Sequence, residues 1–272
     1  MMKDLIIVRG GGDLATGTIH KLCKCGFSVL ILEVETPSAI RRNVSFSEAV
    51  YEGQQTVENV TCYRADSIEH AEFLLQEGKL TVLVDPKGTA ISKLQPTAVV
   101  DAILAKKNLG TDKNMAPITL ALGPGFEAGV DVDAVIETKR GHDLGRVIWN
   151  GSAAPNTGIP GIIGGFGKER VLYSPAAGVL RNICKITDTV EKGDLIAEVQ
   201  TDSGCVPVTA SMDGLLRGLI RDGYPVTKGF KMADIDPRME EYQNCFTISD
   251  KARCIAGGVV EAILQLKGER SL

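Results

Sequence analysis

The chain has 272 residues, of which 44% are hydrophobic and 24% are charged, as is ordinary for a soluble globular protein. A chain of this length can bury a core without cross-links, which excludes a disulfide miniprotein and a mainly disordered chain. The 30 basic and 34 acidic residues give a net charge of -4. Nucleic-acid-binding proteins usually show a basic excess, and no apolar run here approaches the ~18 residues of a membrane span. We therefore expect neither nucleic acid nor a membrane as a partner.

The seven cysteines and three histidines show no metal-binding spacing. No two cysteines form a CxxC motif, and no histidines form HxxxH or HExxH, so we expect no protein-built metal site. The apolar stretch at residues 5–8 (LIIV) runs directly into glycines and is too short for a signal peptide. We expect a cytoplasmic protein whose thiols are free.

The N-terminal part of the chain predicts a βαβ unit. Residues 5–8 and 29–32 (VLIL) are continuous apolar runs, which are typical of strands buried on both faces of a parallel sheet. Between them lie three consecutive glycines and a helical pattern that ends near Cys25. A strand, a glycine turn, a helix and a second strand within ~30 residues make one βαβ unit.

Further strands and one further helix extend this pattern. Residues 80–84 and 118–122 repeat the apolar run of a buried strand, and residues 96–107 have the spacing of an amphipathic helix. Alternating strands and helices indicate a parallel sheet of the α/β class. We therefore predict a Rossmann-like nucleotide- or cofactor-binding domain over residues 1–165.

The glycine turn matches the dinucleotide-binding fingerprint in its alanine form. Residues 10–15 (GGGDLA) fit GxGxxA, and Glu33 follows ~20 residues later, where an acidic residue binds a ribose hydroxyl. Asp13 weakens the match, because a carboxylate at the start of a helix can cap that helix and repel a phosphate. Arg9 stands where this strand usually ends in a small or apolar residue. A purely structural glycine turn is the alternative.

Cationic side chains follow the predicted strands. Arg9, the pair Arg41 and Arg42, and Lys87 all stand just after apolar runs. The carboxyl ends of parallel strands form the crevice in which open α/β sheets bind ligands. Guanidinium groups bind phosphate through two hydrogen bonds, so convergence of these residues predicts an anionic ligand. A solvated charged rim is the alternative.

Residues 135–149 predict a hairpin with a polar tip. The flanks alternate, and residues 139–143 (KRGHD) gather two cations, a histidine and an acid around a glycine. The long loop at residues 150–161 follows, and long loops beside polar clusters are candidate sites. We expect Arg140 and His142 to contact an anion. A charged hairpin tip without a ligand is the alternative.

The following segment contains an internal duplication. Residues 178–199 align without gaps with residues 214–235, an offset of 36 residues, and each copy reads as a short strand, a turn, VxKG and another strand. The pattern resembles the biotinyl/lipoyl-type barrel-sandwich hybrid, whose carrier versions hold a modified lysine on the hairpin between the halves. Residues 200–208 contain no lysine. We therefore expect a duplicated barrel-sandwich-hybrid domain over residues 166–240 with a docking or lid role.

The tail, residues 241–272, is predicted to form a C-terminal helix that packs on a core. Ser249 or Asp250 can cap this helix. Val259, Ile263 and other apolar residues supply one face of it.

Short sequences along the chain form a specific combination, namely residues 9–17 (RGGGDLATG), 37–42 (PSAIRR), 122–126 (LGPGF), 140–146 (RGHDLGR), 155–161 (PNTGIPG) and 234–238 (DIDPR). Together they resemble the YqeB-type family, accessory proteins in the maturation of selenium-dependent molybdenum hydroxylases. The resemblance covers nearly the full chain. It implies a protein that binds the molybdenum cofactor (molybdopterin) or its precursor, with a xanthine-dehydrogenase-like molybdenum hydroxylase as client.

The residues and the resemblance agree on an anionic ligand that carries a phosphate. Arg9 and the glycine turn would approach the phosphate, and Asn156 would read an edge of the pterin. The other cations would bind further anionic groups, and Asp13 would cap the helix or contact the ligand. The predicted ligand-binding residues are Arg9, Gly10, Gly11, Gly12, Asp13, Glu33, Arg41, Arg42, Lys87, Arg140, His142 and Asn156.

Two alternatives remain open. An NAD(P)-dependent oxidoreductase would use Glu33 for the ribose, or Arg41 and Arg42 for a 2′-phosphate. A sulfur or selenium carrier would use Cys25 or Cys205, which requires an exposed cysteine of lowered pKa. Because no catalytic residue stands out, a non-enzymatic cofactor-handling protein is preferred, and a homo-oligomer is compatible with the sequence.

Overall fold

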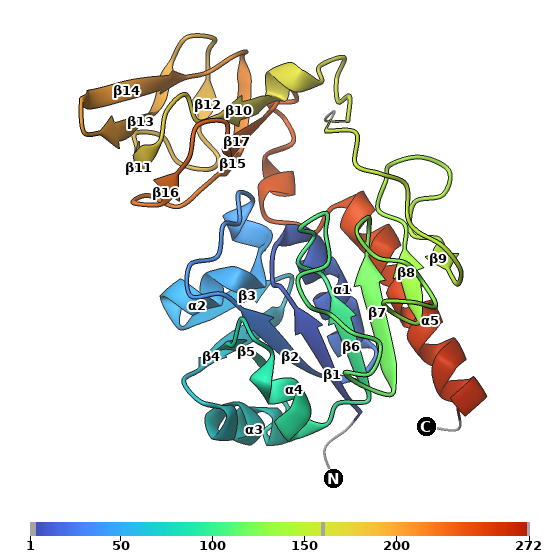
Figure 1. Ribbon diagram of the computed structural model, residues 1–272. Coiled ribbons are helices and arrows are strands. Elements are labelled where there is room, and N and C mark those ends of the chain that lie inside the picture. Colours follow the sequence, from blue (N-terminus) through green and yellow to red (C-terminus); the bar gives the residue numbers. More distant parts are fainter. Residues whose placement is uncertain (1–3, 159–160, 271–272) are drawn as a thin grey trace. The chain divides into compact units, whose positions relative to one another are not determined.

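The chain divides into two compact units. The computed structural model describes residues 4–158 and 161–270 (Figure 1). Unit 1 takes residues 1–37, 45–157 and 248–272, and unit 2 takes residues 38–44 and 158–247. Each unit is therefore assembled from segments that are far apart in the sequence. Within the described ranges, no helix is long and apolar enough to cross a membrane.

A nine-stranded mixed sheet forms the centre of unit 1, with the strand order β3-β4-β5-β2-β1-β6-β7-β8-β9. Its strands are β1 (Leu5–Arg9), β2 (Ser28–Glu33), β3 (Gln54–Val57), β4 (Val60–Ala65), β5 (Leu80–Val84), β6 (Ala98–Asp101), β7 (Ile118–Leu122), β8 (Ala134–Ile136) and β9 (Val147–Ile148). The strands from β4 to β8 in this order pair in parallel. The two edge strands, β3 and β9, pair antiparallel.

The inner strands are apolar along their whole length because they are buried on both faces. Ile6, Ile7 and Ile31 are fully buried. β1 and β2 pair in parallel, with Ile6 opposite Val29, and α1 (Asp13–Lys24) connects them. This pairing confirms the predicted βαβ unit.

The remaining helices of unit 1 are α2 (Ala49–Glu52), α3 (Ile68–Gln76), α4 (Thr89–Leu94) and α5 (Asp250–Arg270), with a 3₁₀ turn at Phe46–Glu48. α5 packs on α1. A Cβ atom at Gly17 of α1 would lie 2.7 Å from the Cβ atom of Ala252, closer than real side chains approach. The glycine therefore lets the two helices meet at backbone distance.

The predicted helix at residues 96–107 is wrong. Residues Ala98–Asp101 form β6, which pairs in parallel with β1 on one side and β7 on the other. Val99 and Val100 are fully buried there. A short apolar run is compatible with a strand or a helix. Hydrogen bonding to strands on both sides stabilises the strand here.

Unit 2 contains two four-stranded sheets in which every pairing is antiparallel, ordered β10-β17-β15-β12 and β14-β13-β11-β16. The strands are β10 (Val171–Tyr173), β11 (Gly178–Asn182), β12 (Thr189–Val190), β13 (Leu195–Thr201), β14 (Gly204–Thr209), β15 (Gly214–Leu219), β16 (Pro225–Val226) and β17 (Lys231–Asp236). Short 3₁₀ turns lie at Arg42–Val44, Lys168–Arg170 and Tyr242–Cys245. Leu180, Ile196, Leu216 and Ile235 belong to one buried apolar cluster that draws on both sheets.

The internal duplication is present in the structure. β11, β12 and β13 of the first copy correspond to β15, β16 and β17 of the second. A Cβ atom at Gly178 would lie 2.1 Å from the carbonyl oxygen of Gln200, and one at Gly214 would lie 2.5 Å from that of Asp236. Because both copies bring a neighbouring strand closer than any Cβ atom allows, both positions require glycine.

The predicted fold class, a Rossmann-like parallel sheet joined to a biotinyl/lipoyl-like barrel-sandwich hybrid, is wrong. The large sheet of unit 1 is mixed, because the short strands β3 and β9 add antiparallel edges to it. The duplicated segment forms two separate antiparallel sheets. The apolar pattern identified the parallel centre, whereas the edge strand β3 is short and partly polar and carries little signal, and the predicted hairpin at residues 135–149 did not show that its strands join the large sheet.

Candidate functional site

The glycine turn leaves β1 at the carboxyl edge of the unit 1 sheet. Gly10 has a φ of +95°, and its N–H donates to the carbonyl oxygen of Leu32 (2.8 Å). A Cβ atom there would lie 3.0 Å from the carbonyl oxygen of Ala102. The N–H of Gly11 donates to Oε1 of Glu33 (2.7 Å). The ends of β2 and β6 therefore hold the turn in place.

The N-terminus of α1 faces open space. Gly12 is the N-cap residue in an extended conformation and has no side chain to cap the helix. A Cβ atom at Gly12 would meet nothing within 4 Å. The helical bonding begins with the N–H of Thr16, which donates to the Gly12 carbonyl (2.8 Å). The earlier N–H groups have no partner within the helix, and such a terminus suits an anion.

Glu33 lies where the fingerprint places a ribose contact. Its carboxylate accepts hydrogen bonds from the N–H of Gly11 (2.7 Å) and the N–H of Val34 (2.9 Å). Burial raises the pKa of this carboxyl above its ordinary value, and the two hydrogen bonds partly oppose that change. Glu33 therefore stabilises the glycine turn through its hydrogen bond to the Gly11 N–H.

Arg9 is buried, with 5% of its surface exposed. Its Nη1 donates to the Thr111 hydroxyl (2.5 Å) and lies 3.9 Å from a carboxylate oxygen of Asp101. Burial raises the pKa of Asp101, while hydrogen bonds from Thr111 and the Ile103 N–H, together with the charge of Arg9, oppose the shift. Arg9 thus fixes the segment that follows β6.

β8 and β9 confirm the predicted hairpin at residues 135–149. Glu137, directly after β8, is only 6% exposed. Its two carboxylate oxygens accept the N–H of Lys139 (2.7 Å) and the N–H of Ala154 (2.8 Å). Glu137 therefore joins the start of the hairpin tip to the long loop behind it.

Lys251 is half-buried in the first turn of α5. Burial lowers the pKa of its ammonium below the ordinary 10.5, and the nearby guanidinium of Arg140 lowers it further. The carboxylates that oppose this shift are Asp13, Glu137 and Asp250. These five residues, called the Lys251 cluster below, bring together α1, the end of β8, the hairpin tip and α5.

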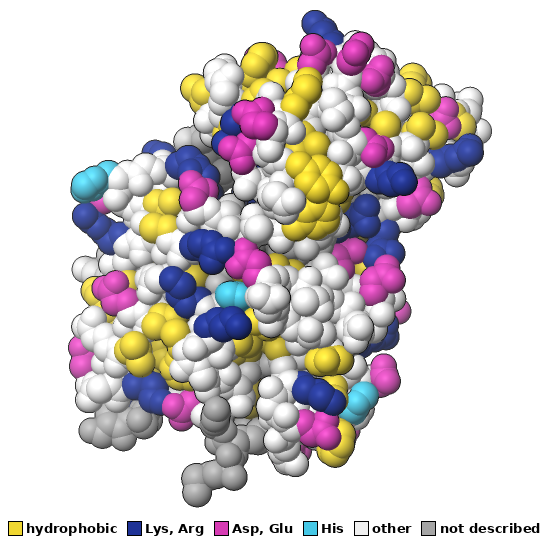
Figure 2. Space-filling view, turned by 180° about the vertical axis from the view of Figure 1, so that it is seen from behind, with side chains coloured by type: hydrophobic (Ala, Val, Ile, Leu, Met, Phe, Trp, Pro, Cys, Tyr) yellow, Lys and Arg dark blue, Asp and Glu magenta, His cyan; other side chains and the backbone are white. Residues whose placement is uncertain are grey.

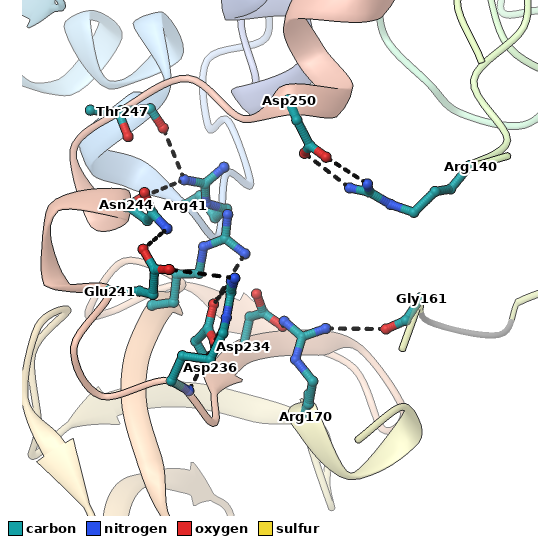
Figure 3. Close-up of polar contacts among 12 residues, drawn as sticks. Arg41, Arg140, Gly161, Arg170, Asp234, Asp236, Glu241, Asn244, Thr247 and Asp250 are labelled. Carbon is teal, nitrogen blue, oxygen red and sulfur yellow. Dashed lines mark hydrogen bonds and ion pairs between the residues drawn. The ribbon is translucent and has the colours of Figure 1, made fainter. Parts of the chain in front are cut away.

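Arg140 and Asp250 form the defined ion pair of the Lys251 cluster. Nη1 and Nη2 of Arg140 donate to the two carboxylate oxygens of Asp250, at 2.7 and 3.2 Å (Figure 3). These bonds raise the pKa of Arg140, so the guanidinium stays charged. Arg140 and Asp13, both predicted ligand contacts, each act on the charge of Lys251.

Several further contacts fix the start of α5. The Glu58 carboxylate accepts the N–H of Ile248 (2.7 Å) and Nη2 of Arg253 (2.6 Å). The Cys254 thiol donates to the carbonyl oxygen of Leu144 (3.0 Å). With α1 in contact at Ala252, this end of the helix is held from three sides, and so is the backbone that carries Lys251.

Three predicted site residues of unit 1 lie at exposed positions. Lys87 is in the turn after β5, His142 is in the hairpin tip and Asn156 is in the long loop. Residues 159–160 of that loop lie outside the described residues. On the face drawn in Figure 2, Lys and Arg side chains are interspersed with Asp and Glu side chains.

Arg41 and Arg42 belong to unit 2 and bind within it. Nη2 of Arg41 donates to the carbonyl oxygens of Asn244 (2.8 Å) and Thr247 (3.2 Å), as Figure 3 shows. Nε of Arg42 donates to the carbonyl oxygen of Leu219 (2.8 Å). Both arginines thereby hold residues 38–44 against unit 2.

Sequence reasoning missed Glu137 and Lys251 as site residues. Glu137 comes directly after an apolar strand and Glu33 is the last residue of one, and an acidic residue at the end of an apolar run was a usable signal. Lys251 carried no signal, because its surroundings depend on the packing of α5 against α1.

The cysteines proposed as carriers, Cys25 and Cys205, are exposed. Burial raises the pKa of Cys23 to about 12, which keeps that thiol protonated. A sulfur- or selenium-carrier role for an exposed cysteine stays a prediction. Among the residues that the structure describes, no group of three His, Cys, Asp or Glu side chains could hold a metal ion.

No family model matches the chain. It is similar to the uncharacterized protein YqeB of Escherichia coli (strain K12), at 49% identity over 262 residues. That alignment covers 96% of this chain and 48% of YqeB, so the chain spans about half the length of the curated relative. The similarity supports the YqeB-type resemblance.

Solved structures show only remote similarity. An aspartoacylase family protein from Mesorhizobium loti aligns with a TM-score of 0.29 and 12% identity, over 86% of this chain and 85% of that one. The ectoine utilization protein EutE (DoeB) from Ruegeria pomeroyi aligns with a TM-score of 0.28 and 12% identity, over 86% of each chain. Similarity this low carries no argument about function.

Proposed function

We propose that the protein binds an anionic, nucleotide-like ligand at the carboxyl edge of the unit 1 sheet, and that this ligand is the molybdenum cofactor or its precursor. In this proposal the protein is an accessory factor in the maturation of a selenium-dependent, xanthine-dehydrogenase-like molybdenum hydroxylase. The observation that carries the proposal is the open N-terminus of α1 at Gly12 beside the Lys251 cluster.

The terminus of α1 suits a phosphate. Backbone N–H groups of the first turn would donate to phosphate oxygens, and the positive end of the helix dipole favours the negative charge. Asp13, in that first turn, opposes an anion. The charges of Lys251 and Arg140 in the same cluster reduce this repulsion.

One further group of the cluster suits a pterin. Carboxylates only accept hydrogen bonds, so Asp13 would match an amino or ring N–H group of a pterin. Asn156, with both donor and acceptor atoms, would read a further edge. The resemblance to YqeB-type accessory proteins supports the same ligand, and the client enzyme is inferred from that resemblance alone.

Analysis of the ligand that co-purifies with the protein tests the proposal. Native mass spectrometry, with elemental analysis for molybdenum and selenium, would be applied to the wild type, Lys251→Gln and Lys79→Gln. Lys79 is a matched control, because it pairs with Glu77 before β5, at the amino edge of the sheet. We expect a pterin phosphate on the wild type and the control, with occupancy about tenfold lower in Lys251→Gln, equivalent to ~1.4 kcal/mol.

Other outcomes would contradict the proposal. A stoichiometric NAD or NADP mass would favour the oxidoreductase alternative. A ligand present at a free concentration of 100 times its Kd stabilises the folded protein by about 2.7 kcal/mol, and a thermal melt detects this as a higher melting temperature. If nothing co-purifies and a pterin phosphate does not raise the melting temperature, the glycine turn is structural.

A further inference from the structure

A cavity of about 1050 Å³ lies within unit 1 at the amino edge of the large sheet, at the other end of the strands from the glycine turn. Its lining includes Pro96, Pro117 and Asp133, which stand just before β6, β7 and β8. Residues of α4 and Arg270 at the end of α5 also line it. Binding pockets for small molecules usually enclose ~300–1,000 Å³, so this cavity has room for one small ligand.

Part of the cavity wall is apolar and is fixed by the core. Ile91 of α4 is 4% exposed and belongs to a buried apolar cluster. Met115 and Ala116, which also line the cavity, are partly buried and pack against the same cluster. These side chains therefore offer a preformed surface on which an apolar group of a ligand can be buried.

The charged residues of the cavity wall are two cations, Lys113 and Arg270, and one anion, Asp133. The side chain of Asp133 is 4% exposed. Its Oδ1 accepts Nη2 of Arg270 (2.7 Å), and its Oδ2 accepts Nη1 of Arg270 (3.3 Å) and the N–H of Thr119 (2.8 Å). The bonds to Asp133 raise the pKa of Arg270, so the guanidinium stays charged. Arg270 therefore balances the buried carboxylate.

Lys113 supplies the excess positive charge. Its Nζ lies 3.8 Å from Oδ1 of Asp133, beyond hydrogen-bond distance, and donates to the carbonyl oxygen of Gly129 (3.3 Å). Among the described residues this is its single hydrogen bond, whereas an ammonium has three N–H donors. A carboxylate on the ligand would match the one excess charge. A phosphate monoester carries about 1.5–2 negative charges and would place uncompensated charge near Asp133.

We propose that this cavity binds a small carboxylic acid with an apolar body. The ligand carboxylate accepts hydrogen bonds from the ammonium of Lys113, and the apolar body lies on Ile91, Met115 and Ala116. This site is separate from the anion site proposed at the carboxyl edge of the sheet, and neither proposal rests on the other.

NMR of the methionine methyl groups tests the proposal on the whole chain. The probes are benzoate, which joins a ring to a carboxylate, and benzamide, its neutral counterpart of nearly the same shape. We expect benzoate to shift the methyl resonance of Met115 until the site is saturated, with the resonance assigned by a Met115→Leu variant. Benzamide should bind at least ~10-fold more weakly, because it lacks the charge that strengthens the hydrogen bond to an ammonium. Phenyl phosphate should also bind more weakly than benzoate.

Two lysine variants show whether the affinity comes from this cavity. Lys113→Gln removes the excess charge, so benzoate should bind ~10-fold more weakly while benzamide is unaffected. Lys79→Gln is the matched control, because Lys79 also lies at the amino edge but pairs with Glu77 (2.7 Å) and does not line the cavity. It should leave benzoate binding unchanged. Melting temperatures equal to that of the wild type would show that both variants are folded.

Three results would overturn the proposal. If benzoate does not shift the Met115 resonance, or if benzamide binds as tightly as benzoate, the cavity is not a carboxylate site. If phenyl phosphate binds more tightly than benzoate, the class of ligand is wrong. If Lys79→Gln weakens benzoate as much as Lys113→Gln does, the attraction comes from the overall charge of the protein and not from this cavity.

Discussion

Glu58 couples a strained turn to the start of α5. It forms, with Asn59, the two-residue turn between β3 and β4, and both residues have positive φ angles, +45° and +65°. Left-handed backbone costs a residue with a side chain ~1–2 kcal/mol. The carboxylate of Glu58 accepts hydrogen bonds from Ile248 and Arg253, which offset this strain.

Removing the charge of Glu58 should have a pH-dependent cost. Partial burial acts to raise the pKa of Glu58, but the bonds from Ile248 and Arg253 outweigh it and lower the pKa below the ordinary 4.5. Such a carboxyl stabilises the fold above pH 4.5 and loses that contribution as the pH falls through its folded value. We expect Glu58→Gln to cost about 1–2 kcal/mol at pH 7 in urea unfolding, and progressively less below pH 4.5.

A matched control exists for this residue. Glu77 pairs with Lys79 (2.7 Å) at an exposed position. Glu77→Gln should change the free energy of unfolding by less than ~0.5 kcal/mol at either pH. An equal loss for Glu58→Gln at pH 7 and at acidic pH would mean that its shape, and not its charge, supports the turn.

α5 offers a direct test of its own packing, because two adjacent glycines in it have opposite surroundings. A Cβ atom at Gly258 would lie 2.1 Å from the carbonyl oxygen of Gly145, whereas one at Gly257 would meet nothing within 4 Å. Gly258→Ala should destabilise unit 1 by about 1–3 kcal/mol, as overpacking does. Gly257→Ala should stabilise it by ~0.5–1 kcal/mol, the gain in helix propensity. Thermal melts that shift in the same direction for both variants would contradict the close contact between α5 and the hairpin.

On the scale of the whole molecule, charged side chains tie together the segments of unit 2. Asp236 is fully buried and accepts Nε (2.9 Å) and Nη2 (2.8 Å) of Arg238, with Arg217 at 3.6 Å. Arg170 bonds to Asp234 (3.0 Å), which lies on the same strand, β17 (Figure 3). Removing one partner of such a group leaves buried charge without compensation, which typically costs 3–5 kcal/mol.

The single tryptophan makes this cost measurable in one unit at a time. Trp149 belongs to unit 1, so its fluorescence reports on that unit, whereas far-ultraviolet circular dichroism reports on both. We expect Asp236→Asn to lower the free energy of unfolding of unit 2 by about 3–5 kcal/mol, so that part of the dichroism signal is lost at a lower denaturant concentration. The unfolding transition followed by Trp149 should stay in place. Arg181→Gln, which breaks only an exposed pair with Glu198, should change neither. Coincident shifts of both probes would show that the two units unfold together.

Local patterns in the sequence predicted those helices and strands that depend on residues close to one another in the chain. The apolar runs and glycines around α1 identified β1, α1 and β2, and the repeat with its 36-residue offset identified matching strands at Gly178 and Gly214. In each case the signal lies within one segment or in two copies of it.

Features that depend on distant segments could not be predicted. β6 lies between β1 and β7, and this pairing turned a helical pattern into a strand. Lys251 becomes half-buried only because α5 packs on α1 some 230 residues earlier in the chain, at Gly17. Arg41 and Arg42 lie in residues 38–44, which belong to unit 2, although the segments before and after, residues 1–37 and 45–157, belong to unit 1.

That last arrangement has a consequence for synthesis of the chain on the ribosome. Residues 38–44 emerge early, yet their partners Leu219, Asn244 and Thr247 emerge nearly two hundred residues later. Unit 1 must likewise wait for α5, which the ribosome makes last of the described helices. At about 5–20 residues per second, the early segment stays without these partners for roughly ten to forty seconds. Neither unit can therefore finish folding before residue 247 has been made, and the Lys251 cluster assembles only after the start of α5 has left the ribosome.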